Sequence, residues 1–430
     1  MVRSEKGVDM EAWESCLRHA ALAAGARVLE GVFEDMGSGR RTEPVRCKCG
    51  QRMNSVGLRE KTIRTILGPV RFARSLFVCP GCGTSRFPGD ELLGVQNTSF
   101  SPGARRMMAR AGSRTSFADA EEDLRIYAGI KVNRKDVERI AESVGDEIEA
   151  WMREKRDEAI KQEDEAAPRA HGGKVPVMYV SFDGTGVPMR RAELLGRRGK
   201  GPDGSAKTRE VKLGCVFTQT TTDDRGKPVR DPDTTTYDGA IESSDEFGWR
   251  IYAQALLRGI EHAENVVVLT DGARYNKSIT NLHFPTATHI IDLYHAREHL
   301  HDLCKMLLPE AQLEALQGKW REFLDAGEIE TLVAQLKKYL PPGGKLRHEA
   351  MREINYFLNN AELMRYAKFR SKKFFVGSGV VEAGCRTLIG ERLKKSGMFW
   401  SLEGANAIIA SRCSQFSRRW DQFWEDKASA

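Results

Sequence analysis

The segment VPVMYVSFDGTG, residues 175–186, decides how the central part of the chain is interpreted. Its apolar run is typical of a strand that is buried on both faces, and the run ends abruptly at Asp183. Because Asp-Gly is a favoured turn dipeptide, Asp183 and Gly184 predict a turn that closes this strand. The same pattern returns in ENVVVLTDGARYN, residues 264–276, where a second buried strand ends at Asp271. Two buried strands that end in this way predict a pair of carboxylates at one edge of a sheet.

The order of the elements around these two strands predicts an α/β fold with a mixed sheet. A shift to Ala, Pro and Gly over residues 163–176 indicates a domain boundary just before the first strand. Two more strands, a well-capped amphipathic helix, the strand that ends at Asp271, another helix and a third buried strand follow. This last strand ends near Asp292 and runs into a helical region that extends to about residue 370. The segments concerned are KLGCVFTQT (212–220), TTTYDGAIE (234–242), SSDEFGWRIYAQALLRG (243–259) and THIIDLYHAREHL (288–300).

Carboxylates at a shared sheet edge indicate a magnesium site, because hard Mg²⁺ prefers oxygen ligands. Two ions close together require several carboxylates, and such a pair holds both the attacking and the leaving oxygen of a phosphodiester displacement. A third carboxylate is therefore expected, and FFVGSGVVEAGCRTLIGERLKKSGMFWS, residues 374–401, offers it. The tripeptide at residues 377–379, GSG, precedes a helix whose first turns contain Glu382. Glu391 and Glu403 are alternatives, but both lie farther from this glycine-rich entry.

The N-terminal half combines a basic stretch with two pairs of cysteines. Nine basic residues and one acid, Glu60, lie between Arg46 and Arg86, in a chain of net charge +7. The cysteine pairs, CKCG and CPGCG, flank two alternating apolar segments around a Gly68-Pro69 turn, as in a zinc ribbon. Nine cysteines in a chain without a secretory signal favour metal binding over disulfides. We therefore predict one structural zinc ion, with the ligands Cys47, Cys49, Cys79 and Cys82.

Helices are predicted on both sides of this ribbon. Residues 10–34 have amphipathic helical spacing, and residues 102–155 contain three more helices, two of which follow the caps Ser116 and Asn133. These two meet across a short turn, which predicts either a helix-turn-helix that reads DNA with residues 133–146 or a plain helical bundle. Both interpretations stay open at this stage.

Several motifs together resemble the DDE transposases of bacterial insertion sequences, and in particular the ISKra type. They are SFDGTG, LTDGARYN, DLYH and GSGVVEAGCRTLIGERLKKSGMFWS, with CKCG…CPGCG, FPGDELLG and SFADAEEDLRIYAGIKV in the N-terminal half. The resemblance extends from about residue 45 to residue 420. It implies a ribonuclease H-like catalytic domain at residues 174–297 and 373–425, interrupted by a helical insertion at residues 298–372. An N-terminal helix (1–40), a zinc-ribbon-like domain (41–100) and a helical, helix-turn-helix-like DNA-binding domain (101–165) would precede it.

The resemblance also implies an activity and a set of site residues. Asp183, Asp271 and Glu382 would be the catalytic triad that holds two Mg²⁺ or Mn²⁺ ions, with Asp183 bridging them. Water would cleave the DNA at a transposon end and free a 3′-OH, which would attack target DNA in line, without a covalent protein intermediate. Asp292 and His295 match a D-x-x-H element of related transposases, where it would support the active site or position DNA.

Basic loops near these motifs are expected either to contact the DNA backbone or to form solvated patches. They comprise Arg197, Arg198 and Lys200 in one loop and Arg392, Lys394 and Lys395 in another. Trp400 follows the second group, and we expect it to pack in the core rather than to stack on a base. The expected partners are double-stranded DNA, at transposon ends and at the target, and further copies of the chain assembled on that DNA.

Two other classes of protein fit part of this pattern. One is a ribonuclease H-like DNA nuclease that cuts without strand transfer, and the other is a noncatalytic DNA-binding protein derived from a transposase. The complete carboxylate set speaks against the second class. The longest apolar runs, such as VVVL at residues 266–269, are too short to span a bilayer, and the N-terminal MVRSEKGVDMEAW has no apolar core. We therefore expect a cytoplasmic, nucleoid-associated protein of a bacterium, without a membrane partner.

Overall fold

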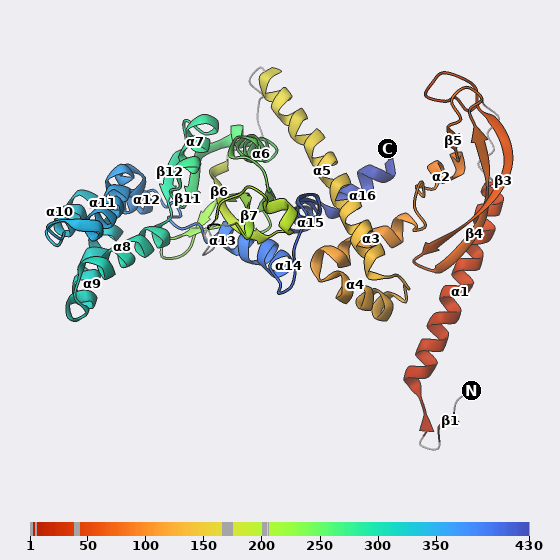
Figure 1. The fold of residues 1–430 in the computed structure, drawn as a ribbon, viewed down its shortest axis with the longest axis horizontal. Coiled ribbons are helices and arrows are strands. Elements are labelled where there is room, and N and C mark those ends of the chain that lie inside the picture. The colour runs from red at the N-terminus through yellow and green to blue at the C-terminus, as the bar shows by residue number, and fades with distance from the viewer. Residues whose placement is uncertain are drawn as a thin grey trace. The chain divides into compact units, whose positions relative to one another are not determined.

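The computed structural model describes residues 3–4, 7–37, 44–165, 175–199, 204 and 206–429 of the chain. The chain forms two compact units, Met1–Val144 and Gly145–Ala430, and Figure 1 shows their helices and strands. The boundary between the units falls inside helix α5 (Arg134–Glu165). Most of the expected domain boundary at residues 163–176 lies outside the described residues, and the finer division into domains stays a prediction.

The first unit is built on a long β-hairpin that is partly covered by a helix. Ala26 of the helix packs against Ile63, Val70 and Phe72 of the hairpin. The helix and both long strands confirm the sequence prediction, although the first strand begins earlier because its pairing continues back to Asn54. The elements are β1 (Arg3–Ser4), β2 (Gly7–Val8), α1 (Met10–Met36), β3 (Asn54–Thr65), β4 (Gly68–Val78), β5 (Ser85–Arg86) and α2 (Pro88–Leu92).

Part of the basic charge on this hairpin is neutralised inside the unit. Lys61 donates to the buried carboxylate of Asp90 at 2.9 Å, and Arg74 donates to the same carboxylate. Arg86 pairs with Glu91 through two hydrogen bonds of 2.9 and 2.6 Å. Both acids lie on α2, just after the basic stretch in sequence. The sequence count of nine bases to one acid therefore overstates the charge that is available to an external anion.

Three predicted helices follow the hairpin. The expected caps are present: Oγ of Ser116 accepts from the amide of Asp119 at 3.0 Å, and Oδ1 of Asn133 accepts from the amide of Asp136 at 2.8 Å. Gly129 has a φ of 71°, so the chain leaves the second helix through the left-handed region. The helix-turn-helix stays a prediction. The elements are α3 (Pro102–Arg114), α4 (Phe117–Asp123), the π-helical turn η1 (Leu124–Ala128) and α5.

The second unit is built around a mixed five-stranded sheet. Its strands lie in the order β10-β7-β6-β11-β12. Strand β7 is antiparallel to its neighbours β10 and β6, and β11 is parallel to its neighbours β6 and β12. Counted along the chain, these strands are the third, second, first, fourth and fifth, which is consistent with the ribonuclease H-like sheet that the resemblance implies. The strands are β6 (Val175–Pro188), β7 (Thr208–Gln219), β10 (Thr236–Ala240), β11 (Ala263–Thr270) and β12 (Thr288–Ile291), with a separate ribbon of β8 (Thr221–Thr222) and β9 (Pro228–Val229).

Strand β6 does not end at Asp183, and this corrects the predicted turn. Its antiparallel pairing with β7 continues to its last residue, Pro188, whereas its parallel pairing with β11 stops at Ser181. Asp183 therefore lies inside a strand, at the point where β11 has already left the sheet. A Cβ on Gly184 would lie 2.4 Å from Oε1 of Glu210, so this glycine leaves space for the cross-strand side chain of Glu210.

Helices cover both faces of the sheet. On one face, α6 and α7 pack on a core that contains Phe182, Phe247 and Ile279. On the other face, the core that contains Tyr179 and Leu269 continues into the helices that follow β12. These helices confirm the predicted helical region. The bounds are α6 (Ser244–Leu256), α7 (Arg274–His283), α8 (Leu293–Leu307), α9 (Glu310–Ala326), α10 (Ile329–Lys337), α11 (Gly344–Asn359) and α12 (Tyr366–Ser371).

A buried ion network holds the second half of α5 to the edge of the sheet. Asp238 of β10 accepts from Arg156 of α5 at 2.8 Å and from Arg250 of α6 at 3.0 Å. Burial by itself would raise the pKa of Asp238, but the two guanidinium groups outweigh it and lower the pKa. The remaining elements of this unit are α13 (Gly379–Gly384), the π-helical turn η5 (Cys385–Gly390), α14 (Glu391–Leu393), α15 (Leu402–Phe416), α16 (Trp420–Ser429) and the 3-10 helices η2 (Arg191–Leu194), η3 (Ile260–His262) and η4 (Ala361–Met364).

Candidate active site at the edge of the sheet

Asp183 lies half-buried on β6, beyond the last residue that pairs with β11. Its Oδ1 accepts a hydrogen bond of 2.7 Å from the amide of Gly184. Burial is the largest influence on Asp183 and raises its pKa; the Gly184 amide and His295 oppose this, while the negative charges of Asp271 and Glu382 add to it. Both other predicted acids and His295 thus lie within electrostatic range of Asp183.

Asp271 follows β11 directly and begins the turn into α7. Here the predicted Asp-Gly turn is present, with Gly272 in the left-handed region at a φ of 86°. Oδ1 of Asp271 accepts from the amide of Ala273 at 2.9 Å and from the side-chain amide of Asn276 at 2.6 Å. Asn276 is fully buried and orients this carboxylate. It is a site residue missed at the sequence level, since its only signal is its place in the first turn of the helix after Asp271.

Glu382 is brought to the same edge by the segment that precedes α13. The buried carboxylate of Asp292, at the end of β12, accepts hydrogen bonds from the amide of His295, at 2.8 Å, and from the amide of Ser378. Ser378 in turn donates its hydroxyl to Oε1 of Glu382 at 2.6 Å. Nε2 of His295 lies 3.9 Å from the same oxygen. Asp292 therefore connects the start of α8 to the entry of α13, which carries Glu382.

An Asp, His and Glu group at this edge has donor atoms that could hold a divalent metal ion. Within the described part of the chain, the ligand atoms of Asp292, His295 and Glu382 all lie within 4.8 Å of one another. Asp183 and Asp271 do not belong to so tight a group, and ligands divided between two ions roughly 4 Å apart need not do so. Because both oxygens of Asp292 already accept backbone amides, its geometry favours a positioning role over ligation.

Replacing Asp183 with asparagine is expected to stabilise the metal-free protein at neutral pH. The folded-state pKa of Asp183 is raised, so its ionisation destabilises the folded state as the pH rises through that value, and a neutral amide removes this cost. The difference from wild type should vanish below the unfolded-state pKa of about 4. Urea unfolding in the presence of a chelator, from about pH 3 to pH 8, measures the effect. Asp224→Asn, at an exposed position, is the matched control. A free energy of unfolding for Asp183→Asn at neutral pH that does not exceed the wild-type value would contradict the prediction.

The basic residues expected to contact DNA divide into exposed and buried ones. Lys394 donates to Oγ1 of Thr185, which lies two residues after Asp183 and hence on the same face of β6. Lys200 lies outside the described residues. The exposed members of the predicted set are Arg197, Arg198, Lys394 and Lys395.

Arg392 is buried, which corrects its predicted role as a DNA contact. Its guanidinium carbon lies 4.8 Å from the centroid of the Trp400 ring, so the charge is used in packing rather than presented at the surface. Trp400 is itself buried and donates its Nε1 to the carbonyl of Leu393 at 3.0 Å. The prediction that Trp400 packs in the core is therefore confirmed.

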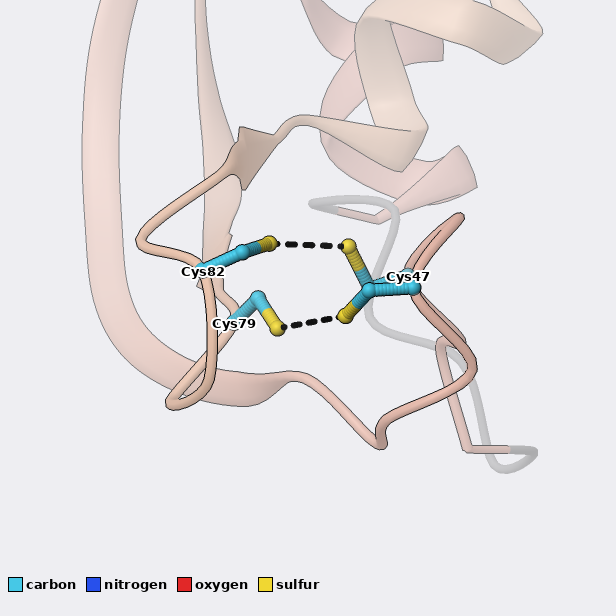
Figure 2. A group of neighbouring side chains, drawn as sticks. Cys47, Cys79 and Cys82 are labelled. Atoms are coloured by element: carbon cyan, nitrogen blue, oxygen red, sulfur yellow. Dashed lines mark hydrogen bonds between the residues drawn. The ribbon is translucent and has the colours of Figure 1, made fainter.

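A second cluster of ligand-type side chains lies in the first unit, at the open end of the β3–β4 hairpin. Sγ of Cys47 lies 3.5 Å from Sγ of Cys82, and Sγ of Cys49 lies 3.4 Å from Sγ of Cys79. In Figure 2 the side chains of Cys47, Cys79 and Cys82 lie close together. All four sulfurs lie within 4.8 Å of one another. A zinc ion about 2.3 Å from each sulfur would set the sulfurs roughly 3.8 Å apart. The cluster therefore fits the predicted structural zinc ion in number, type and spacing of its ligands.

Glycine turns present the two pairs of cysteines. Gly50 and Gly83 follow their cysteine pairs in the left-handed region, with φ values of 88° and 72°. In the second pair, the side-chain amide of Gln51 from the first turn reaches over Gly81, where a Cβ would lie 2.2 Å from Oε1 of Gln51. The shorter C-x-C spacing of the first pair is thus compatible with convergence of all four thiols.

The thiols of the cluster differ in their readiness to ionise. Hydrogen bonds from the hydroxyl and amide of Thr84 lower the pKa of Cys82 to about 6. The amide of Gln51 favours the thiolate of Cys49, but the neighbouring sulfurs outweigh it and raise the pKa of Cys49 to about 12. A bound zinc ion would displace the protons of these four thiols, because metal ligands must be deprotonated.

The described residues contain no helix that is long and apolar enough to span a bilayer. No protein-family model and no curated protein matches this chain. Among solved structures it is similar to the Drosophila P element transposase strand transfer complex, with 10% identity and a TM-score of 0.23 over 74% of this chain and 79% of that chain. A structural similarity this low carries no argument about the function of this chain.

Proposed function

We propose that this chain is a DDE transposase that cleaves DNA at the ends of a mobile element and joins those ends to target DNA. The observation that supports this most is that Asp183 and Asp271 lie side by side, two residues beyond the paired Ser181 and Leu269, and that Ser378 and Asp292 bring Glu382 near them. They do so at the edge of a sheet whose strand order is consistent with a ribonuclease H-like fold. The assignment to the ISKra type rests on the sequence motifs.

Mg²⁺ or Mn²⁺ ions held by the three acids would supply Lewis-acid stabilisation of the reacting phosphodiester. Asp183, Asp271 and Glu382 would together hold these ions. Residues of the chain fix the orientation of these acids in advance. Asn276 donates to Asp271, and Asp292 anchors the segment that carries Glu382. Such preorganisation lowers the cost of assembling the site during the reaction.

The same edge would serve both chemical steps. In the first, the water oxygen would form a P–O bond as the bond from phosphorus to the 3′ oxygen breaks, which leaves a 5′-phosphate and, with a proton from the water, a free 3′-OH. In the second, the oxygen of that hydroxyl attacks a target phosphodiester in line, so that one P–O bond forms as another breaks. Positioning and charge stabilisation would carry the rate, and no covalent protein intermediate is required. Lys394 and Lys395 would contact the backbone of the bound DNA.

We further propose that the first unit recognises DNA. Its cysteine cluster would hold a structural zinc ion in a ribbon, and α4 and α5 would form a helix-turn-helix whose reading helix starts at residue 133. Exposed basic side chains at the start of α5 support this assignment, namely Arg134, Lys135 and Arg139. Double-stranded DNA is the proposed partner, with further copies of the chain assembled on it.

A strand-transfer assay with the full-length protein tests the proposed function. Labelled DNA that carries the sequences flanking the gene is incubated with a target plasmid in Mg²⁺ or Mn²⁺. Wild type is expected to give joined products, and Asp183→Asn is expected to give none while retaining DNA binding. The exposed Asp224→Asn serves as the matched control.

Two other outcomes would overturn the proposal in different ways. Cleavage without joined products, lost in Asp183→Asn, would identify a nuclease with the same site. DNA binding without cleavage by wild type would identify a noncatalytic DNA-binding protein. The buried, hydrogen-bonded supports of Asp271 and Glu382 favour the catalytic interpretation, because a protein that only binds DNA does not need oriented carboxylates.

A further inference from the structure

A groove of about 760 Å³ lies between the start of α7 and helix α11, and we call it the α7–α11 groove. Asn355 and Asn359 line it, together with basic residues from both helices. Within the described part of the chain, no aspartate or glutamate lines it. The basic residues are Arg274 and Lys277 on α7 and Arg347, His348 and Arg352 on α11.

Among the described residues, acids offset only part of the charge of the α7–α11 groove, through the contact of Arg352 with Glu353. The guanidinium of Arg274 has no hydrogen-bond or ion-pair partner among the described residues. Lys277 and Arg347 donate to backbone carbonyl oxygens, at 3.0 and 2.7 Å, which leaves their charges uncompensated. Arg352 is 74% exposed and lies 3.4 Å from Glu353, a weak surface pair. The groove therefore presents a positive potential that attracts an anion.

The α7–α11 groove begins next to a proposed metal ligand. Gly272, which lines the groove, is the residue after Asp271. The hydroxyl of Tyr356, also in the lining, donates to the carbonyl oxygen of Asp271 at 3.3 Å. Tyr356 is held in place by the ring of His299, whose centroid lies 4.1 Å away and whose Nδ1 contacts Glu353 at 2.8 Å. Helix α11 is thus fixed to the catalytic edge, with its acid Glu353 engaged by His299.

We propose that the α7–α11 groove binds backbone phosphates of the DNA strand that is engaged at Asp271, an inference that rests on the proposed function. Phosphates recur along each DNA strand about every 3.4 Å of helix axis. A strand held at the catalytic edge therefore presents further phosphates to the surface beside it. Arginine, lysine and asparagine side chains are the usual donors to phosphate and sugar oxygens. The helical insertion would then hold DNA against the catalytic sheet.

The salt dependence of DNA binding tests this assignment in the full-length Asp183→Asn background, where chemistry is blocked. Arg274→Ala combined with Arg352→Ala removes one exposed charge from each wall of the α7–α11 groove. Lys319→Ala combined with Lys337→Ala removes the same charge from exposed positions of the insertion outside the groove. Each lost phosphate contact reduces the slope of log K against log salt by about 0.9, so the groove variant should lose about 1.8 and the control variant none. Thermal unfolding checks that both variants remain folded.

The outcomes separate this proposal from the proposed function. A wild-type slope in the groove variant would overturn the groove assignment, even if strand transfer succeeds. A reduced slope would support it, even if wild type fails to cleave. If the groove variant loses the binding of a free nucleoside triphosphate but keeps the wild-type DNA slope, the groove is a small-phosphate site and the DNA assignment is overturned.

Discussion

Glu382→Gln is expected to slow DNA cleavage by about 10³-fold or more, since a lost metal ligand costs several kcal/mol of transition-state stabilisation. The amide keeps the size of the side chain and can still accept the hydroxyl of Ser378, so the local structure should survive. What it loses is the negative charge that offsets a divalent cation. Rates of single-turnover cleavage, measured across a range of Mg²⁺ concentrations, would show both a lower maximum and a weaker metal dependence.

The two alternative acids of the same region provide the controls for this experiment. Glu391 and Glu403 are exposed, and both follow Glu382 in sequence. Glu391→Gln and Glu403→Gln should therefore cleave DNA at close to the wild-type rate. If either of them abolishes cleavage while Glu382→Gln retains it, the third carboxylate has been assigned to the wrong helix.

Loss of bound zinc is expected to unfold the end of the hairpin that carries the four cysteines. The apolar cluster there is small, and it consists of Val45, Cys47, Met53, Phe77 and Cys79. So few buried side chains do not offset the entropy of ordering two turns, whereas structural zinc sites of small domains contribute about 10 kcal/mol or more. The metal would therefore supply most of the local stability.

Cys79→Ser tests this expectation, with the exposed Cys16→Ser as its control. Metal analysis should find one zinc ion per chain in wild type and in Cys16→Ser, and none in Cys79→Ser. Limited proteolysis should then cut Cys79→Ser near the cysteine turns and leave the second unit intact. A metal-free protein whose turns resist protease as well as wild type would contradict the prediction.

The elements of both units could be predicted well from the sequence, because their signals are local. Buried apolar runs predict β6, β7, β11 and β12, and the caps Ser116 and Asn133 mark two helix starts. The prediction of a turn at Asp183 was wrong, and the reason is physical. Whether an Asp-Gly pair turns or continues a strand depends on the partner strand, and β7 is long enough to extend the pairing to Pro188.

The candidate site could be predicted only in part, because its supports depend on tertiary contacts. The acids Asp183, Asp271 and Glu382 stand out as motif residues, although their role as ligands stays a prediction. The place of Asn276 in the first turn after Asp271 does not by itself predict that it is buried and orients this carboxylate. The sequence does not predict the burial of Arg392 either. A basic residue beside two exposed lysines is expected at the surface, whereas Arg392 packs on Trp400.

The helical insertion leaves the sheet and returns to it at nearly the same point. The amide of Leu293 donates to the carbonyl of Val376 at 2.9 Å, and Asp292 accepts the amide of Ser378 beside it. The insertion is in effect a closed loop that is fastened at its base, so the position of Glu382 does not depend on how many residues the loop contains. The contacts at this base, rather than the number of residues between Asp271 and Glu382, therefore fix how the segment that carries Glu382 meets the sheet.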